Sequence, residues 1–272
     1  MPAPVDASAR VLANTRLSAD YNVVAFDAPE LAAVTQPGQF VMIRTAAGTD
    51  PLLRRPFSVF EVVRDGTGAP AGFSILSKRV GPGTARLYDA SAGDRFSCLG
   101  PLGRPFSLLS PASEAWMIAG GVGLAPFVLL ADALRARDVG VTLFYGGRRS
   151  EDLLYLDWFA SRRVSLVLAT EDGSRGTAGL VTAPLEAALS SAGSGRDVML
   201  YACGPEPMLK TVASLAQRFD RRVELSVERM MGCGMGGCYS CVVRVLDEDG
   251  RARYVRSCLA GPVMDGKVIV WE

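Results

Sequence analysis

Four cysteines toward the C-terminal end of the 272-residue chain have the spacing of an iron–sulfur site. Cys233, Cys238 and Cys241 form a C-x4-C-x2-C pattern, and Cys258 follows after a gap of sixteen residues. This is the plant-type spacing for a [2Fe-2S] cluster, in which four thiolates are the only protein ligands. Because such clusters move single electrons, the spacing predicts redox chemistry.

Zinc and disulfides are the alternative uses of these cysteines. Structural zinc sites commonly show paired C-x2-C knuckles, often with His, and this chain contains no His. Disulfides need an oxidising compartment, and the first fifteen residues lack the apolar stretch of a signal peptide. The glycines between Cys233 and Cys238 allow a loop to approach a cluster closely. The pattern therefore favours [2Fe-2S] over zinc, and the lack of His excludes a Rieske centre.

Length and composition indicate a multidomain protein without a nucleic-acid or membrane partner. A chain of this length suggests two domains, or three if one is small. The net charge of +1 gives no reason to expect nucleic acid or anionic lipid. The longest uncharged apolar stretch, 116–131, contains Pro126 and is too short to span a membrane. We expect a cytoplasmic protein, in which Cys98 and Cys203 are by default buried thiols.

The elements that must position these residues fall into three successive patterns. Short β-type runs separated by Gly, Pro and Asp predict an antiparallel β-barrel or sandwich; they cover 15–28, 38–46, 54–63, 71–80 and 93–103. Alternating apolar strands and helices then predict an open parallel sheet, with strands at 115–120, 141–147, 164–170 and 197–204 and helices at 124–137, 152–160, 178–191 and 205–219. Around the cysteines, 241–258 predicts a hairpin turned by Asp249-Gly250. The predicted domains are 1–111, 112–222 and 223–272.

Two glycine-containing turns follow predicted strands of the parallel sheet. One is Gly120-Gly121-Val122-Gly123, and the other is Cys203-Gly204-Pro205 at the start of a helix. Such turns let the backbone approach a pyrophosphate at a helix N-terminus, although the first turn has Pro126 in place of the third glycine of the dinucleotide fingerprint. Tight packing is the alternative explanation for these glycines. At the carboxyl ends of parallel strands, both turns are expected to line one crevice.

Two segments of the predicted barrel suggest a second anionic ligand. Arg55-Pro56-Phe57-Ser58 combines a cation, a ring and a hydroxyl, and Gly83-Thr84 precedes a helical stretch. Backbone N–H groups and a hydroxyl at a helix start are suited to phosphate. An ordinary barrel strand with an exposed Arg is the alternative reading, and the residues by themselves do not identify the ligand.

The order of these motifs resembles that of the ferredoxin–NADP⁺ reductase superfamily. R-P-F-S, G-x-G-T, GGVGLAP, CGPEPM and C-x4-C-x2-C…C follow one another as they do there, over nearly the whole chain. More closely, the segments 170–182 and 228–243 are similar to those of the electron-transfer subunits of class B dihydroorotate dehydrogenase. Related reductase subunits share most of these motifs. The motifs are therefore more specific for the superfamily than for this subfamily.

The resemblance implies three cofactors and a residue set for each. For FAD the matching positions are Arg55, Pro56, Phe57, Ser58, Leu76, Ser77, Lys78, Gly83 and Thr84, with Lys78 where the family more often has Arg. For NAD they are Gly121, Gly123, Pro126, Gly204 and Pro205. Cys203 matches the catalytic position beside the nicotinamide. Cys233, Cys238, Cys241 and Cys258 match the ligands of the [2Fe-2S] cluster.

The resemblance also implies a route for electrons. A hydride carries two electrons and the cluster one, so a flavin is expected between them. The implied order is partner FMN, [2Fe-2S], FAD and NAD⁺, with dihydroorotate oxidised on a separate FMN-containing catalytic subunit for pyrimidine biosynthesis. A heterotetramer with two copies of each subunit is expected.

Alternatives remain for the nucleotide and the function. Arg148 and Arg149 follow the second predicted strand of the parallel sheet, where Arg commonly holds the 2′-phosphate of NADP. A solvated basic loop is the simpler reading, and the resemblance implies NAD. The alternative functions are an NAD(P)H-dependent reductase subunit of a ferredoxin-, sulfide- or hydrogenase-linked complex, and a non-enzymatic module whose cysteines hold zinc.

Overall fold

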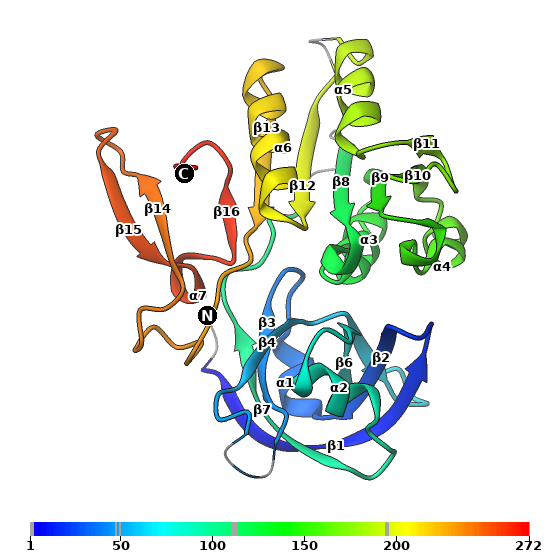
Figure 1. Cartoon of the computed structure of the whole chain (residues 1–272), viewed down its shortest axis with the longest axis vertical. Coiled ribbons are helices and arrows are strands. Elements are labelled where there is room, and N and C mark those ends of the chain that lie inside the picture. Colours follow the sequence, from blue (N-terminus) through cyan, green and yellow to red (C-terminus); the bar gives the residue numbers. More distant parts are fainter. Residues whose placement is uncertain (1–2, 47, 49, 110–113, 194–195, 272) are drawn as a thin grey trace.

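Two seven-stranded sheets and a two-stranded hairpin make up the described part of the chain (Figure 1). The computed structural model describes residues 3–46, 48, 50–109, 114–193 and 196–271. In this part of the chain, no helix is long and apolar enough to cross a membrane.

The first sheet is antiparallel, in the order β4-β3-β7-β1-β2-β6-β5. Its strands are β1 (Val5–Arg16), β2 (Tyr21–Asp27), β3 (Phe40–Arg44), β4 (Arg55–Ser58), β5 (Glu61–Arg64), β6 (Pro70–Lys78) and β7 (Arg95–Leu102), with the helices α1 (Pro29–Val34) and α2 (Pro82–Tyr88). The run 54–63, predicted as one strand, is two strands at opposite edges of the sheet. Between them the chain changes partner, because Val59 N donates to Gln39 O and Phe60 N donates to Ser74 O. The barrel is therefore open between β4 and β5.

The second sheet has the order β11-β10-β9-β8-β12-β13-β16 and is parallel except for β16. Its strands are β8 (Glu114–Gly120), β9 (Gly140–Gly147), β10 (Ser165–Thr170), β11 (Thr177–Ala178), β12 (Val198–Cys203), β13 (Arg222–Ser226) and β16 (Val263–Asp265). The α-helices are α3 (Phe127–Arg135), α4 (Leu156–Ser161), α5 (Thr182–Ser191) and α6 (Glu206–Arg218), with the 3₁₀ turns η1 (Gly121–Leu124) and η2 (Ser150–Asp152).

The parallel sheet is covered by helices on both faces. Phe127 of α3 and Phe159 of α4 belong to one apolar cluster, and Leu185 of α5 and Leu209 of α6 to another. Burial on both faces explains why the central strands are almost continuously apolar. The short strands β11, β13 and β16 were not predicted, because they lack such a run.

The C-terminal region contains the predicted hairpin, β14 (Val242–Leu246) and β15 (Ala252–Arg256), and the short helix α7 (Ser257–Ala260). The turn is closed by the Asp247 carboxylate, which accepts bonds from Asp249 N and Arg251 N, and Gly250 has φ +76°. The predicted boundary at 222/223 falls within β13, and that at 111/112 lies outside the described residues. The three domain ranges stay a prediction.

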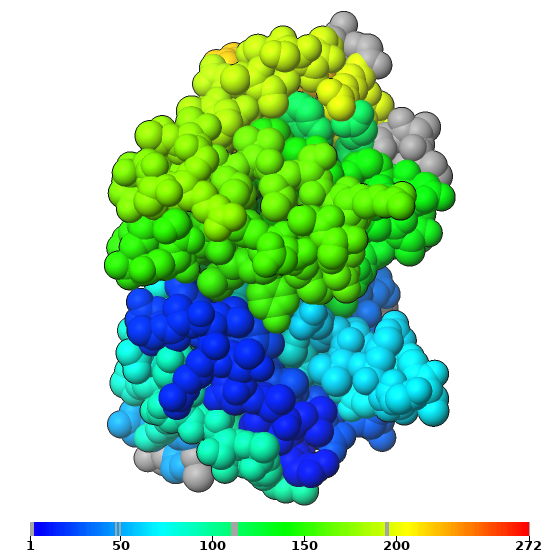
Figure 2. All heavy atoms as spheres, turned by 90° about the vertical axis from the view of Figure 1, so that its right-hand side faces the viewer, coloured from blue at the N-terminus to red at the C-terminus, as the bar shows by residue number. Residues whose placement is uncertain are grey.

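The barrel and the parallel-sheet domain share one apolar core. Tyr21, Phe60 and Leu76 of the barrel pack in the same cluster as Phe127 and Phe159. The ring of Phe60 meets that of Tyr155 edge-on, with centroids 4.7 Å apart. Figure 2 shows the two parts in contact along their common boundary, the barrel in blue and cyan below and the sheet domain in green above. The carboxyl ends of the parallel strands thus lie against the barrel.

We expect stability to fall in alkali because two thiols, apart from those of the four C-terminal cysteines, are buried. Burial raises the pKa of both Cys98 and Cys203 to about 12. Above about pH 9 the unfolded chain releases these protons while the folded chain keeps them, so each thiol lowers the unfolding free energy by up to about 1.4 kcal/mol per pH unit. Urea unfolding between pH 8 and pH 10.5 measures the slope. Cys98→Ala should make it shallower, and an equal slope in the variant and the wild type would contradict the argument.

Candidate functional site

Two neighbouring cavities lie where the parallel sheet meets the barrel. The sheet cavity, about 670 Å³, is lined by Gly120, Gly121, Gly204 and Pro205 at the ends of β8 and β12. The barrel cavity, about 620 Å³, is lined mainly from β4, β6 and the segment after β13. Of the described residues, four line both cavities: Lys78, Val80, Val122 and Glu228. Ligands in the two cavities would therefore meet at these side chains.

The two predicted glycine turns pack directly against each other. A Cβ at Gly120 would lie 2.8 Å from Pro205 Cδ, and one at Gly123 would lie 2.2 Å from Cys203 O. Gly121 has φ +54° and lines the sheet cavity. Among the described lining residues are Gly121, Gly204 and Pro205, but not Gly123 or the buried Pro126. Close packing thus explains the glycine at position 123, whereas Gly121, Gly204 and Pro205 line the sheet cavity.

The predicted flavin segments converge on the barrel cavity. The lining residues among those predicted are Pro56, Phe57, Ser58, Leu76, Ser77, Lys78 and Thr84. The hydroxyl of Ser77 is buried without a hydrogen-bond partner, which is costly unless a ligand supplies one. Arg55 instead donates from Nη1 to Leu53 O at 2.8 Å. The cavity and the orphaned hydroxyl fit a flavin with polar ring edges.

Thr45, just after β3 (Phe40–Arg44), is a residue that sequence reasoning missed. Its hydroxyl is buried without a partner, and a Cβ at Gly83 would lie 2.9 Å from Thr45 Oγ1. The Thr84 hydroxyl is already used, since it accepts from Val80 N at 2.9 Å and donates to Gly81 O at 3.1 Å. At this turn Thr45, rather than Thr84, has a free hydrogen-bonding group. No sequence motif marks it.

Cys203 ends β12 and lines the barrel cavity. Burial raises the pKa of its thiol to about 12, with the Glu228 carboxylate acting in the same direction. The thiol is therefore protonated at neutral pH and is not a nucleophile. It contributes a small neutral group to the wall of the barrel cavity, directly before Gly204 of the sheet cavity.

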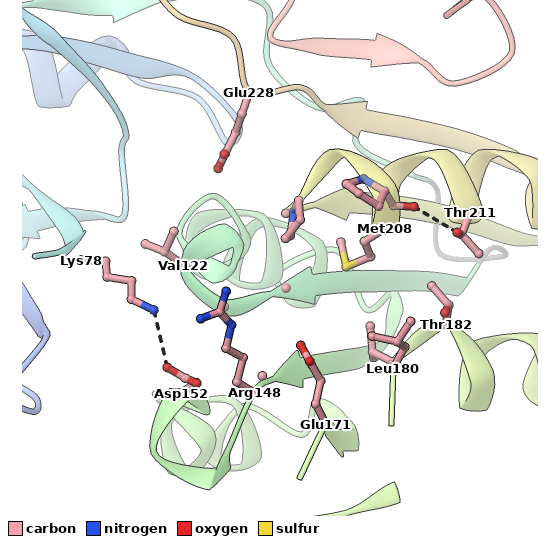
Figure 3. A pocket seen from close by; sticks show the side chains of 18 of the residues that line it. Lys78, Val122, Arg148, Asp152, Glu171, Leu180, Thr182, Met208, Thr211 and Glu228 are labelled. Atoms are coloured by element: carbon pink, nitrogen blue, oxygen red, sulfur yellow. Dashed lines mark hydrogen bonds and ion pairs between the residues drawn. The ribbon is translucent and has the colours of Figure 1, made fainter. Parts of the chain in front are cut away.

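Glu228 was also missed, and it faces both cavities. It points into the sheet cavity from the side opposite Arg148 (Figure 3). Glu228 is exposed to the cavities, and partial desolvation by the surrounding protein raises the pKa of its carboxyl. This carboxyl lies at the junction of the two cavities.

A polar network at the cavity rim joins the barrel to the sheet domain. The Tyr21 hydroxyl donates to Asp152 Oδ1 at 2.9 Å, and Lys78 Nζ lies 3.8 Å from the same oxygen (Figure 3). The Tyr145 hydroxyl donates to Asp152 O at 2.9 Å. Burial raises the pKa of the Tyr21 hydroxyl, so it remains a donor. Lys78, predicted for FAD, is thus held by the other domain and is shared by both cavities.

Arg148 and Glu171 lie together on the far wall of the sheet cavity. Glu171 N donates to Gly147 O at 3.1 Å, which ties the loop after β10 to that after β9. Both side chains project into the cavity (Figure 3). Arg149 instead forms an exposed ion pair with Glu151 at 3.3 Å. Arg149 is therefore part of a solvated basic loop, as the simpler interpretation expected. Arg148 instead lines the cavity beside Glu171, which sequence reasoning missed.

The four C-terminal cysteines come together as two pairs of free thiols. Cys238 lies within hydrogen-bonding reach of Cys233, and Cys258 within reach of Cys241. No three Cys, Asp or Glu side chains of the described residues converge on one point that would hold a single ion. Two pairs of thiols fit a two-iron cluster, in which each iron takes two terminal sulfurs.

The loop around the first pair is shaped to approach a cluster. Gly234 and Gly236 have φ of +73° and +84°, and Met235 N and Gly237 N donate to Cys233 Sγ at 3.4 and 3.3 Å. A hydrogen bond from Ser240 is the largest cause that lowers the pKa of Cys238, to about 6. N–H donors and an acidic thiol favour bound thiolates, so the residues present fit a [2Fe-2S] cluster.

The second pair connects the cluster site to the barrel cavity. Cys241 and Cys258 are only 1% and 2% exposed and pack in one apolar cluster with Phe40 and Met231. Phe40 and Met231 also line the barrel cavity. The cysteine site, the barrel cavity and the sheet cavity are therefore in series.

Comparisons with known proteins agree with this arrangement. Residues 228–270 match the family model of the iron–sulfur cluster binding domain of dihydroorotate dehydrogenase B, and residues 117–214 match the oxidoreductase NAD-binding domain. The dihydroorotate dehydrogenase B (NAD(+)) electron transfer subunit of Desulforamulus reducens is 37% identical over 265 residues, which cover 97% of this chain and 98% of the relative. The subunit of the same name from Bacillus caldolyticus is 41% identical over 238 residues, covering 86% and 87%.

Solved structures share the architecture. The structure of an NADH-dependent reduced ferredoxin-NADP oxidoreductase is 26% identical with a TM-score of 0.83, and the match covers 97% of this chain and 90% of that one. A ferredoxin NADP⁺ reductase from Neisseria gonorrhoeae, solved with FAD and NADP, is 18% identical with a TM-score of 0.63 and covers 80% and 92%. The second likeness establishes the fold alone.

Proposed function

The chain belongs to the family of electron transfer subunits of dihydroorotate dehydrogenase B, and from this membership we propose that it passes electrons from the FMN of a catalytic partner subunit to NAD⁺. The observation that carries the proposal is the series of three sites. The cysteine site shares Phe40 and Met231 with the barrel cavity, and the barrel cavity shares Val122 and Glu228 with the sheet cavity. A [2Fe-2S] cluster, FAD and NAD in these sites would lie in the order that the transfer needs.

Bound FAD would exchange electrons singly with a cluster and in pairs with a nicotinamide. In the barrel cavity Pro56, Phe57 and Leu76 would contact its ring, and the orphaned Ser77 hydroxyl would gain a partner. The Thr45 hydroxyl beside Gly83 would bind its polar tail. Excluding water and fixing orientation are the protein's contributions to this transfer.

The sheet cavity would hold NAD between the two glycine turns. At Gly121 and Gly204 a pyrophosphate could come close to the backbone. Both glycines lie in turns at the carboxyl ends of parallel strands, where such sheets bind nucleotides. Glu171 favours NAD over NADP, because a carboxylate accepts hydrogen bonds from ribose hydroxyls and repels a 2′-phosphate. Glu228 would place a carboxyl group at the meeting point of the two cavities.

Anaerobic reduction tests the proposed route. The purified chain should show flavin and iron–sulfur absorbance, and NADH should reduce both. Dihydroorotate should reduce neither in this chain alone, and both once the FMN-containing subunit is added. A colourless preparation would contradict the redox function. Reduction of the isolated chain by dihydroorotate would contradict the division between subunits, and no transfer with that subunit would favour a different electron-transfer complex.

The stoichiometry of two copies each and the cytoplasmic location stay predictions.

Replacing Cys203 should slow the flavin–nicotinamide step without removing a cofactor. The neutral thiol fills space in the wall of the barrel cavity and directly precedes Gly204 of the sheet cavity. Cys203→Ala should therefore loosen the relative position of the two rings, and we expect flavin reduction by NADH to fall about tenfold. Cys203→Ser should stay closer to wild type. Stopped-flow reduction measures the rate, with Cys98→Ala as a buried-thiol control. An unchanged rate in Cys203→Ala would remove this residue from the proposed catalytic set.

A further inference from the structure

The hydroxyl of Ser240 contacts one of the cluster cysteines. Ser240 Oγ lies 3.1 Å from Cys238 Sγ, and it accepts a hydrogen bond from Gly232 N at 2.9 Å. Ser240 N–H also approaches Cys238. Both residues are exposed, and Ser240 follows Cys238 by two residues. The serine therefore connects the start of the loop to the second cysteine.

The direction of the hydrogen bond to sulfur follows from proton counting. A hydroxyl has one proton and two lone pairs, and Gly232 N–H occupies a lone pair. The hydroxyl proton is then free to point at Cys238 Sγ. A cysteine that binds iron is a thiolate without a proton, so in the loaded protein Ser240 must be the donor.

We propose that Ser240 is a positioning residue that raises the reduction potential of the [2Fe-2S] cluster through its hydrogen bond to Cys238. The proposal rests on the proposed function, because it needs the cluster. Reduction adds one negative charge to the cluster and its sulfurs. A donor to a coordinating sulfur stabilises the more negative, reduced form more than the oxidised form, and such bonds are among the factors that set these potentials.

Side-chain replacement at position 240 isolates the hydroxyl. The Ser240 N–H donor belongs to the backbone and remains in every variant. S240A removes the hydroxyl, while S240T keeps it, and the exposed position has room for the extra methyl. S240V has the shape of Thr without the hydroxyl, so S240T and S240V form a matched pair.

The test is a reductive titration of the purified chain followed by electron paramagnetic resonance. In S240A and S240V we expect the equilibrium constant for cluster reduction to fall about tenfold, a shift of about 59 mV to more negative potential for a one-electron couple. S240T should match the wild type. The flavin potential, read from visible absorbance of the same samples, should not move and serves as an internal control.

Each outcome supports or contradicts an effect of the Ser240 hydroxyl on the cluster potential. Equal cluster potentials in S240T and S240V would overturn the proposal, as would an equal shift of cluster and flavin. If Ala and Val prevented cluster assembly while Thr permitted it, the hydroxyl would have an assembly role instead of a tuning role. A wild-type chain without iron–sulfur absorbance would be a failure of the proposed function, and it is distinguishable from these results.

Discussion

Cys238→Ala is expected to separate the two halves of the electron route. The variant should lose the iron–sulfur absorbance and resonance signal and keep FAD. Electron transfer between the partner subunit and FAD should fall to below about 1% of wild type, since even changes around metal ligands cost about 10- to 100-fold. NADH oxidation with an artificial acceptor should continue, because the barrel and sheet cavities lie on the other side of Phe40 and Met231.

Cys238 suits this test because it is the exposed member of the four. Its side chain contributes little packing, whereas Cys241 and Cys258 are buried against the barrel. Cys98→Ala is the matched control, since it removes a thiol from the barrel core and should leave the cluster in place. Iron and sulfide content, flavin content and the two activities are measured on the same preparations. Full transfer to the partner without a cluster would disprove the series arrangement.

Glu171→Arg is expected to move nucleotide preference from NADH toward NADPH. Glu171 and Arg148 project into the same cavity, so the change replaces a mixed pair with two cations (Figure 3). The change removes the repulsion between the Glu171 carboxylate and a 2′-phosphate and adds a cation that can bind this phosphate. The ratio of kcat/KM for the two nucleotides should therefore change by about 100-fold, in which each factor of ten corresponds to about 1.4 kcal/mol. Glu171→Gln should give an intermediate ratio.

Steady-state rates of the purified chain with an artificial acceptor give these ratios. Glu151→Gln is the control, because Glu151 is a nearby exposed carboxylate paired with Arg149. Its nucleotide preference should equal that of the wild type. If Glu171→Arg retained the wild-type preference, selectivity would have to come from elsewhere in the cavity, with Arg148 the first residue to replace.

Much of the architecture could be read from local patterns. Short β-type runs separated by Gly, Pro and Asp predicted the antiparallel sheet, and apolar strands alternating with helices predicted the parallel one, because both signals are local in the sequence. The hairpin turn at Asp249-Gly250 was predicted for an equally local reason. The strands β11, β13 and β16 were missed, since their pairing depends on distant chain segments rather than on their own residues.

The cysteine spacing by itself determined the kind of chemistry. Four sulfurs at plant-type intervals, within a glycine-rich loop, identify the cluster before any folding is considered, because the spacing reflects how one loop wraps a small inorganic core. The series of motifs likewise identified the superfamily. In both cases the residue types and their spacing along the chain are sufficient, and the packing of distant segments is not needed.

Only the tertiary structure decided how the sites communicate. Residues from β6, η1 and the segment after β13 meet to join the two cavities, and Phe40 and Met231 join the cluster site to one of them. It also assigned Gly123 to packing against Cys203. It placed Glu171 in the sheet cavity and the unpartnered Thr45 hydroxyl beside Gly83, and no motif marks either residue. These roles depend on contacts between segments that are far apart in sequence. Such contacts form when the barrel and the parallel sheet bury a common apolar surface, which no local pattern encodes.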